Sequence, residues 1–167
     1  MKCLCFSDTH GYTYYMRSAI KMHPDAEVIF FLGDGLEDIA PLVEEDRSRM
    51  WIYVRGNCDY RTVGTLGEVK KTDTITLCGR KILCTHGDLH GVKYGEDGLL
   101  LLAERTGADI ILFGHTHRPY EKYIPRDTGG LYLFNPGSIC GSYGERPSFG
   151  VINISDSGVL LSHGNFV

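Results

Sequence analysis

Five short polar motifs in this chain carry residue types that bind metal ions. The paired side chains of the first and last motifs have an i, i+2 spacing, which places both on one side of an extended chain. Carboxylate, imidazole and amide groups together suit Mn, Fe, Zn or Ni better than the all-oxygen sites of Ca. A carboxylate such as Asp34 can bridge two ions about 3.5–4 Å apart. The motifs are Asp8-Thr9-His10-Gly11, Gly33-Asp34-Gly35, Gly56-Asn57, His86-Gly87 and Gly114-His115-Thr116-His117.

Each motif directly follows an apolar segment that predicts a buried strand, at 2–6, 28–32, 51–54, 81–85 and 109–113. Ligands of open α/β sheets bind at the carboxyl ends of the strands, so we expect the motifs to converge on one rim. Taken singly, each motif has an ordinary structural explanation. A histidine at a strand end is commonly a polar terminus or a hydrogen-bonding partner, and G-D-G is commonly a turn. Five such motifs in succession favour a metal site.

The segments between these strands indicate the fold class. Helical patterns occur at 12–22, at 36–47 with Pro41 inside, and at 98–105 with Gly107 as a C-cap. The β-α-β-α-β opening predicts a parallel sheet with helices on both faces. Segments 73–77 and 81–85 predict a hairpin, and the last third predicts strands at 121–124, 131–134, 149–154 and 159–162, with turns at 127–130 and 156–158. We therefore expect one α/β domain over residues 1–167, built of two packed mixed sheets flanked by helices.

The composition excludes several classes of protein. Its 167 residues are 43% hydrophobic and 23% charged, which is a globular balance. A net charge of −4 argues against a partner of long nucleic acid. The chain has no apolar run near the roughly 20 residues of a membrane helix, and a strand is expected from residue 2 with no leader before it. The six cysteines lack C-x-x-C spacing and lie mostly in apolar runs, which predicts reduced, packed thiols and a cytoplasmic location.

The order D-x-H, G-D, G-N, H-G and G-H-x-H, over residues 8–117, resembles that of the calcineurin-like metallophosphoesterases. Two further motifs are similar to the small bacterial and archaeal phosphodiesterases of that superfamily. They are Gly56-Asn57-Cys58-Asp59 and Asn135-Pro136-Gly137-Ser138. With them the resemblance covers almost the whole chain.

This resemblance implies a metal-dependent phosphodiesterase that hydrolyses small phosphate esters by a metal-bridging hydroxide at a dinuclear site. The ions would be divalent, Mn first, with Ni, Fe or Zn as alternatives. One ion would take Asp8, His10, Asp34 and His117, and the other Asp34, Asn57, His86 and His115. The enzymatic alternatives are a phosphomonoesterase or a nucleotide pyrophosphohydrolase. The other alternative is a protein-binding scaffold like the membrane-sorting coat subunit that shares the fold, but the seven intact ligand positions favour an enzyme. The sequence does not determine the oligomeric state, and a homo-oligomer is one possibility.

The chain departs from the superfamily pattern at Cys58, which stands where G-N-H-E relatives carry a histidine that helps to protonate the leaving group. Cys58 is either a catalytic acid or a packing residue, and packing is favoured because cysteine is often buried. Asp88 stands where relatives often carry a second histidine. Asp88 and His90 are interpreted as supports of the ligands or proton donors, and His90 alternatively as a solvated loop residue.

Four further residues have roles that the sequence leaves open or assigns to the surface. The Asn135-Pro136-Gly137-Ser138 turn is a candidate for contact with a phosphate oxygen, through the Ser138 hydroxyl or through backbone N–H groups, and Arg146 is another candidate. His23 and His163 are assigned to the surface.

Overall fold

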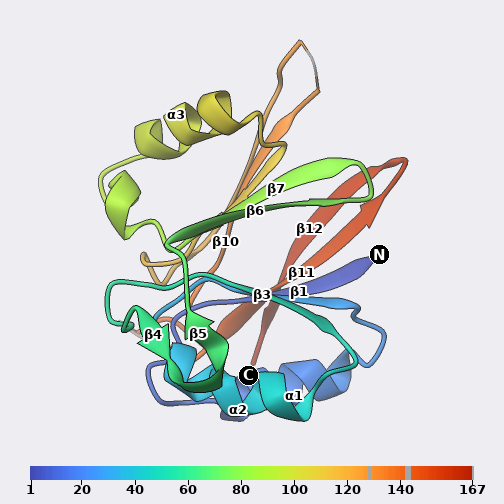
Figure 1. Ribbon diagram of the computed structural model, residues 1–167. Coiled ribbons are helices and arrows are strands. Elements are labelled where there is room, and N and C mark those ends of the chain that lie inside the picture. Colours follow the sequence, from blue (N-terminus) through green and yellow to red (C-terminus); the bar gives the residue numbers. More distant parts are fainter. Residues whose placement is uncertain (128, 142–143, 167) are drawn as a thin grey trace.

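The computed structural model describes residues 1–127, 129–141 and 144–166. Two five-stranded sheets lie face to face, and helices cover the outer face of each (Figure 1). The strand order is β12-β11-β1-β2-β3 in the first sheet and β6-β7-β8-β10-β9 in the second. The expected single α/β domain of two packed mixed sheets is therefore confirmed.

The first sheet holds the three apolar segments of the amino-terminal third as parallel neighbours. They are β1 (Lys2–Phe6), β2 (Val28–Phe31) and β3 (Met50–Tyr53). The helices α1 (Tyr14–Met22) and α2 (Leu36–Glu45) connect them, and Pro41 lies within the second helix. The strands β11 (Ser148–Ser155) and β12 (Gly158–Asn165) form a hairpin that extends this sheet beyond β1.

The second sheet contains the expected hairpin of β6 (Thr72–Leu77) and β7 (Arg80–Thr85). Its tight turn has positive φ at Cys78 and Gly79, as a two-residue hairpin loop requires. The remaining strands are β8 (Ile110–Leu112), β9 (Pro119–Ile124) and β10 (Leu131–Pro136), and β8 pairs in parallel with both β7 and β10. The helix α3 (Asp97–Thr106) ends at Gly107, which adopts the expected left-handed cap with φ 67°.

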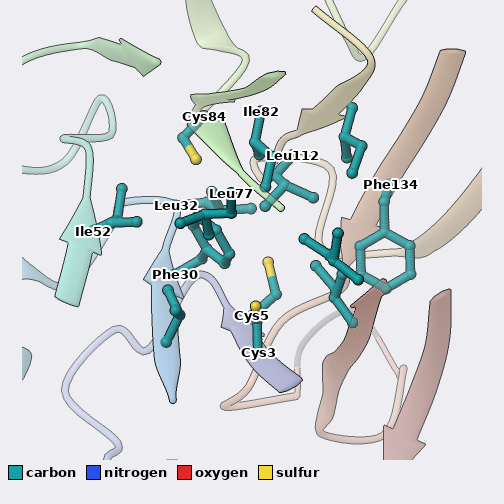
Figure 2. Close-up of a cluster of buried hydrophobic side chains, with 14 of the residues drawn as sticks. Cys3, Cys5, Phe30, Leu32, Ile52, Leu77, Ile82, Cys84, Leu112 and Phe134 are labelled. Atoms are coloured by element: carbon teal, nitrogen blue, oxygen red, sulfur yellow. The ribbon is translucent and has the colours of Figure 1, made fainter. Parts of the chain in front are cut away.

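Three buried clusters hold these layers together. The cluster between the sheets includes Cys5 and Phe30 from the first sheet and Ile82, Leu112 and Phe134 from the second (Figure 2). A second cluster joins the first sheet to α1 and α2, and a third joins the second sheet to α3. The apolar strands are thus buried on both faces, which is why their sequences read as continuous runs.

The expectation that helices cover both faces of the first sheet is wrong. Helices α1 and α2 cover only one of its faces, because the second sheet covers the other (Figure 1). The β-α-β-α-β pattern shows that crossover helices exist, but it does not say whether the helices or a second sheet meet a given face.

Several short elements were not expected from the sequence. They are the strand pair β4 (Thr62–Val63) and β5 (Gly67–Glu68), and the single 3-10 turns η1 (Gly64–Leu66) and η2 (Asp88–His90). The expected turn at 127–130 includes Thr128, which lies outside the described residues. No helix in the described part of the chain has the length and apolar character needed to cross a membrane.

All six cysteines are free in the described structure. Cys3, Cys5 and Cys84 are buried in the core between the sheets, as the apolar surroundings of these residues indicated. Cys58 and Cys78 are exposed.

Candidate metal centre

The motifs that follow the strands lie together at one rim of the sandwich. Within this rim, three sets of side chains place one potential ligand atom each within 4.8 Å of the others. The residues come from loops after β1, β2 and β3 in the first sheet and after β7 and β8 in the second, so both sheets contribute. The three sets are Asp8, His10 and His117; Asp34, His86 and His115; and His10, Asp34 and Cys58.

The first set is built around the buried carboxylate of Asp8. Its Oδ1 atom accepts no hydrogen bond among the described residues, although it is fully buried. It lies 3.2 Å from Nε2 of His117 and 3.7 Å from Nε2 of His10, and these two nitrogens are 3.4 Å apart. A buried oxygen without a hydrogen bond is costly, whereas a cation among these three atoms satisfies it. The donor set therefore fits a divalent transition-metal ion.

The second set centres on Asp34, which is also buried. Its Oδ1 accepts a 2.8 Å hydrogen bond from the backbone N–H of Cys58, and its Oδ2 lies 3.3 Å from Nε2 of His86. Burial raises the pKa of this carboxyl, but the hydrogen bond and charge of His86 and the N–H of Cys58 outweigh burial and hold the pKa below its usual range. Asp34 is therefore an anion with one oxygen directed at the imidazoles.

His86 is oriented by a contact on its far side. Its Nδ1 lies 2.7 Å from the carbonyl oxygen of Leu32, which can only accept, so Nδ1 carries a proton. Without an ion, a proton on Nε2 serves the contact to Asp34. Loss of that proton would leave the Nε2 lone pair free for an ion, beside Nδ1 of His115 at 3.1 Å. An imidazole that donates its other N–H to a carbonyl is the usual arrangement of a metal-ligating histidine.

Backbone conformation singles out the same residues. Non-glycine residues seldom adopt positive φ, and each such residue costs about 1–2 kcal/mol. Among the described residues only six do so, and the sixth, Cys78, belongs to the hairpin turn. The other five are all predicted ligands: Asp8, His10, Asp34, His115 and His117. Strained backbone conformations are concentrated at functional sites, where they direct side chains toward a ligand that they would not face from a relaxed loop.

Glycines allow the ligand loops to approach one another. A Cβ on Gly33 would lie 2.4 Å from the backbone nitrogen of Gly56, and a Cβ on Gly56 would lie 2.0 Å from Oδ1 of Asp34. Neither position accepts a side chain, because the atoms in the way are a backbone nitrogen and a ligand carboxylate. The two glycines therefore keep the loops after β2 and β3 at the distance that the site requires.

Two carboxylates that sequence reasoning left without a role hold these loops in place. Asp59 accepts four backbone hydrogen bonds of 2.7–2.9 Å, from the N–H groups of Asp34, Gly35, Leu36 and Gly56. The second carboxylate is Asp38 in α2, which holds the loop after β1. Its Oδ2 accepts hydrogen bonds from the hydroxyl of Thr9 at 2.6 Å and from the N–H of Gly11 at 2.8 Å. The available signal was the acidic residue directly after Gly56-Asn57-Cys58.

Asn57 and Cys58 both lie in the loop after β3, and their side chains contact each other, which the sequence did not indicate. Asn57 is exposed, and its amide Nδ2 donates to Sγ of Cys58 at 3.2 Å. Cys58 is also exposed and can face a cation together with His10 and Asp34, so its interpretation as a packing residue is wrong. Burial of its sulfur and the nearby Asp34 raise the pKa of the Cys58 thiol to about 11.

The residues after His86 support the site from outside. Asp88 pairs with Lys71 at 2.8 Å, and the same ammonium donates to the carbonyl of Gly56 at 2.9 Å. This contact links the loop after β7 to the loop after β3, which agrees with the supporting role considered for Asp88. His90 is half-buried rather than fully solvated, and burial lowers the pKa of its imidazole.

The Asn135-Pro136-Gly137-Ser138 turn holds the ligand loops rather than facing outward. Nδ2 of Asn135 donates to the carbonyl of Gly114 at 2.8 Å and to the hydroxyl of Thr116 at 3.1 Å. Ser138 is buried, and its hydroxyl donates to the carbonyl of Asp8 at 2.9 Å. The proposed phosphate contact through this hydroxyl is therefore wrong, because the hydroxyl already donates its proton within the protein.

The remaining predicted residues lie away from these loops or are packed differently. Arg146 is exposed. His23 and His163 are half-buried rather than on the surface. His163 stacks on Phe134 with ring centres 4.5 Å apart and contacts the carbonyl of Asn135 at 2.8 Å.

Comparison with known proteins agrees with this geometry. The family model of the calcineurin-like phosphoesterase superfamily domain matches residues 1–157. The chain belongs to this superfamily. It is 35% identical over 141 residues to the probable metallophosphoesterase YsnB of Bacillus subtilis, covering 83% of this chain and 75% of that protein.

Two further proteins extend the comparison. The phosphodiesterase YfcE of Escherichia coli is 28% identical over 172 residues, covering 92% of this chain and 88% of YfcE. The structure of Vps29 from Entamoeba histolytica, solved in complex with Zn²⁺, superposes with a TM-score of 0.75 at 20% identity and full coverage of both chains. At that identity, the Vps29 likeness concerns the fold.

Proposed function

We propose that this protein is a metal-dependent phosphodiesterase that hydrolyses small phosphate esters at a dinuclear site. The observation that carries the proposal is the pair of adjacent ligand sets, each made of one buried carboxylate and two imidazoles. Asp34 lies between the sets, because its carboxylate groups both with His86 and His115 and with His10. Mn²⁺ is the proposed ion, and Ni²⁺, Fe²⁺ or Zn²⁺ are alternatives for the same donors.

The chain itself provides binding and orientation in this mechanism. Bound divalent ions supply Lewis acidity for the phosphoryl oxygens and lower the pKa of water so that hydroxide is available near neutrality. Two carboxylates do not cancel the charge of two divalent ions, so the rim attracts an anionic ester although the chain is acidic overall. The strained loops hold the imidazoles of His10, His115 and His117 in place, and the carbonyl of Leu32 holds that of His86, so little reorganisation is needed during the reaction.

Phosphodiester substrates are favoured over the alternatives by kinship with YfcE, a protein named a phosphodiesterase. A phosphomonoesterase or a nucleotide pyrophosphohydrolase would use the same ions and differ in what the rim accepts. The non-enzymatic alternative is a protein-binding scaffold, which the likeness in fold to Vps29 leaves possible. Such a scaffold would bind ions but hydrolyse no ester.

A metal-reconstitution assay tests the proposal. The chelated protein should have no activity on bis(p-nitrophenyl) phosphate, and added Mn²⁺ should restore it, with Mg²⁺ less effective because it prefers all-oxygen octahedral shells. The monoester p-nitrophenyl phosphate should be the poorer substrate. Turnover by protein that elemental analysis shows to be free of metal would reject the mechanism, and ion binding without turnover of any ester would favour the scaffold.

A further inference from the structure

A cavity of about 600 Å³ opens directly beside the candidate metal centre. His115 and Thr116 form the wall nearest the centre, and the other walls come from the segment before α3, from α3 itself and from the start of β9. A volume of this size is typical of a site for a small organic molecule. The lining is largely apolar and includes Val92, Leu99, Phe113, Pro119 and Tyr120.

Two cationic side chains also line this cavity, Lys93 and Arg118. Both are exposed, and none of the ion pairs between described residues involves either of them. The cavity therefore combines an apolar wall with positive charge on the side of the metal ligands.

The single carboxylate in the lining is already neutralised. Glu96 accepts a hydrogen bond from the hydroxyl of Tyr120, and Nζ of Lys122 donates to its other oxygen at 2.7 Å. These contacts fix the aromatic ring of Tyr120 in the wall and remove the negative charge that would repel an anionic ligand.

A second, smaller cavity lies at the candidate centre itself. It measures about 180 Å³ and is lined by His10, Asp34 and Cys58 together with the carboxylates of Glu37, Asp38 and Asp59. This cavity coincides with the ligand set of His10, Asp34 and Cys58, and its small volume suits an ion better than an organic substituent. Of these two cavities, only the one beside His115 has the volume and the apolar wall that an organic substituent needs.

We propose that the cavity beside His115 binds an aromatic or similarly large apolar group of the phosphate ester, while Lys93 and Arg118 contact its anionic oxygens. This inference rests on the proposed function and narrows its substrate class to esters that carry such a group. It makes Val92 and Tyr120 determinants of specificity and leaves the chemistry to the metal centre.

Ligand binding tests the inference without requiring turnover. Phenylphosphonate should bind the Mn²⁺-loaded protein about 10- to 100-fold more tightly than methylphosphonate in calorimetry, because the ring is buried. Val92→Phe fills the cavity and should remove most of this preference. Val43→Phe is the matched control, since Val43 is a half-buried valine that lines a separate cavity beside Trp51. Equal affinity for the two phosphonates, or a preference that Val92→Phe leaves intact, overturns the inference.

An exposed variant provides a test that does not disturb packing. Lys93→Ala should weaken binding of both phosphonates by about threefold, as expected for one exposed charge. Lys21→Ala, an exposed lysine on α1, is its control. If Lys93→Ala binds like the wild type, the assigned contact to the anion is wrong.

Kinetics separates this inference from the proposed function. Phenyl p-nitrophenyl phosphate and methyl p-nitrophenyl phosphate share a leaving group, so the ratio of their kcat/KM values reports on the other substituent. The ratio should favour the phenyl ester by about tenfold or more and fall in Val92→Phe. Hydrolysis of both esters with no such preference rejects the cavity assignment alone. A phenylphosphonate preference without hydrolysis of either ester rejects the proposed function alone.

Discussion

Asp34 is the carboxylate shared by two of the three ligand sets, whereas Asn57 is the expected ligand of one ion alone. We therefore expect Asp34→Asn to reduce kcat on bis(p-nitrophenyl) phosphate by about 10³-fold, comparable to the loss of a principal electrostatic element. Asn57→Ala should reduce kcat less, because it removes a side chain expected to bind only one of the two ions. Elemental analysis of both variants reports metal content, and Asp156→Asn, in an exposed turn, controls for the substitution. An Asp34→Asn variant no worse than Asn57→Ala would refute the bridging role.

Cys58 is an exposed thiol whose sulfur accepts a hydrogen bond from the amide of Asn57, and without bound ions desolvation and the nearby Asp34 raise its pKa to about 11. We expect Cys58→Ser to change hydrolysis of alkyl esters by less than about threefold, since general acids usually contribute 10²–10⁴-fold. Activity should then depend strongly on the leaving group, with nitrophenyl esters far better than alkyl esters. Cys78→Ser, at an exposed cysteine in the hairpin turn, is the control. A hundredfold loss confined to alkyl esters, at unchanged metal content, would identify Cys58 as the acid.

At the scale of elements, the loops after β2 and β3 are joined through one side chain. The four backbone N–H groups that Asp59 binds belong to these two loops and to the start of α2. Asp59→Asn offers one acceptor oxygen in place of two and directs N–H donors at backbone N–H groups. We expect metal affinity to fall about 10- to 100-fold, as for other residues that orient ligands.

Titration with Mn²⁺ separates positioning from general destabilisation at Asp59. Saturating Mn²⁺ should restore most of the activity of Asp59→Asn if the residue only positions the loops. Asp25→Asn, which removes an exposed carboxylate paired with Lys2, should leave metal affinity unchanged. Loss of activity that high Mn²⁺ does not recover would mean that Asp59 has another role.

The same loops show how far sequence reasoning reaches. Each ligand motif was found because it follows an apolar strand, and strand ends at one rim are a consequence of parallel pairing. Asp59 was part of a recognised motif but was given no role, because its four partners are backbone groups that have no sequence signature. Ser138 was misassigned for a related reason: a hydroxyl near a turn looks the same in sequence whether it binds a ligand or the carbonyl of Asp8. The two-sheet arrangement was predicted, but the faces covered by α1 and α2 depend on long-range packing.

At the scale of the whole molecule, the candidate centre joins the two sheets. Asp8, His10 and Asp34 follow strands of the first sheet, while His86, His115 and His117 follow strands of the second. Ions held by both groups would fasten the two sheets to each other at this rim. Without ions, the same rim keeps a buried oxygen of Asp8 without a hydrogen bond and five strained backbone conformations. The site therefore lowers the stability of the metal-free protein and raises that of the metal-bound one.

This argument predicts how metals change thermal unfolding. An ion at about 100 times its Kd adds about 2.7 kcal/mol to the free energy of unfolding, so saturating Mn²⁺ should raise Tm by about 5–10 °C for each ion. Asp8→Asn should lose the increase contributed by the first ligand set. In the presence of a chelator, its Tm should be no lower than that of the wild type, because a neutral amide replaces the buried carboxylate oxygen. The measurement is calorimetry of both proteins with chelator and with Mn²⁺. An equal Mn²⁺-dependent rise in the two proteins would show that Asp8 does not hold an ion.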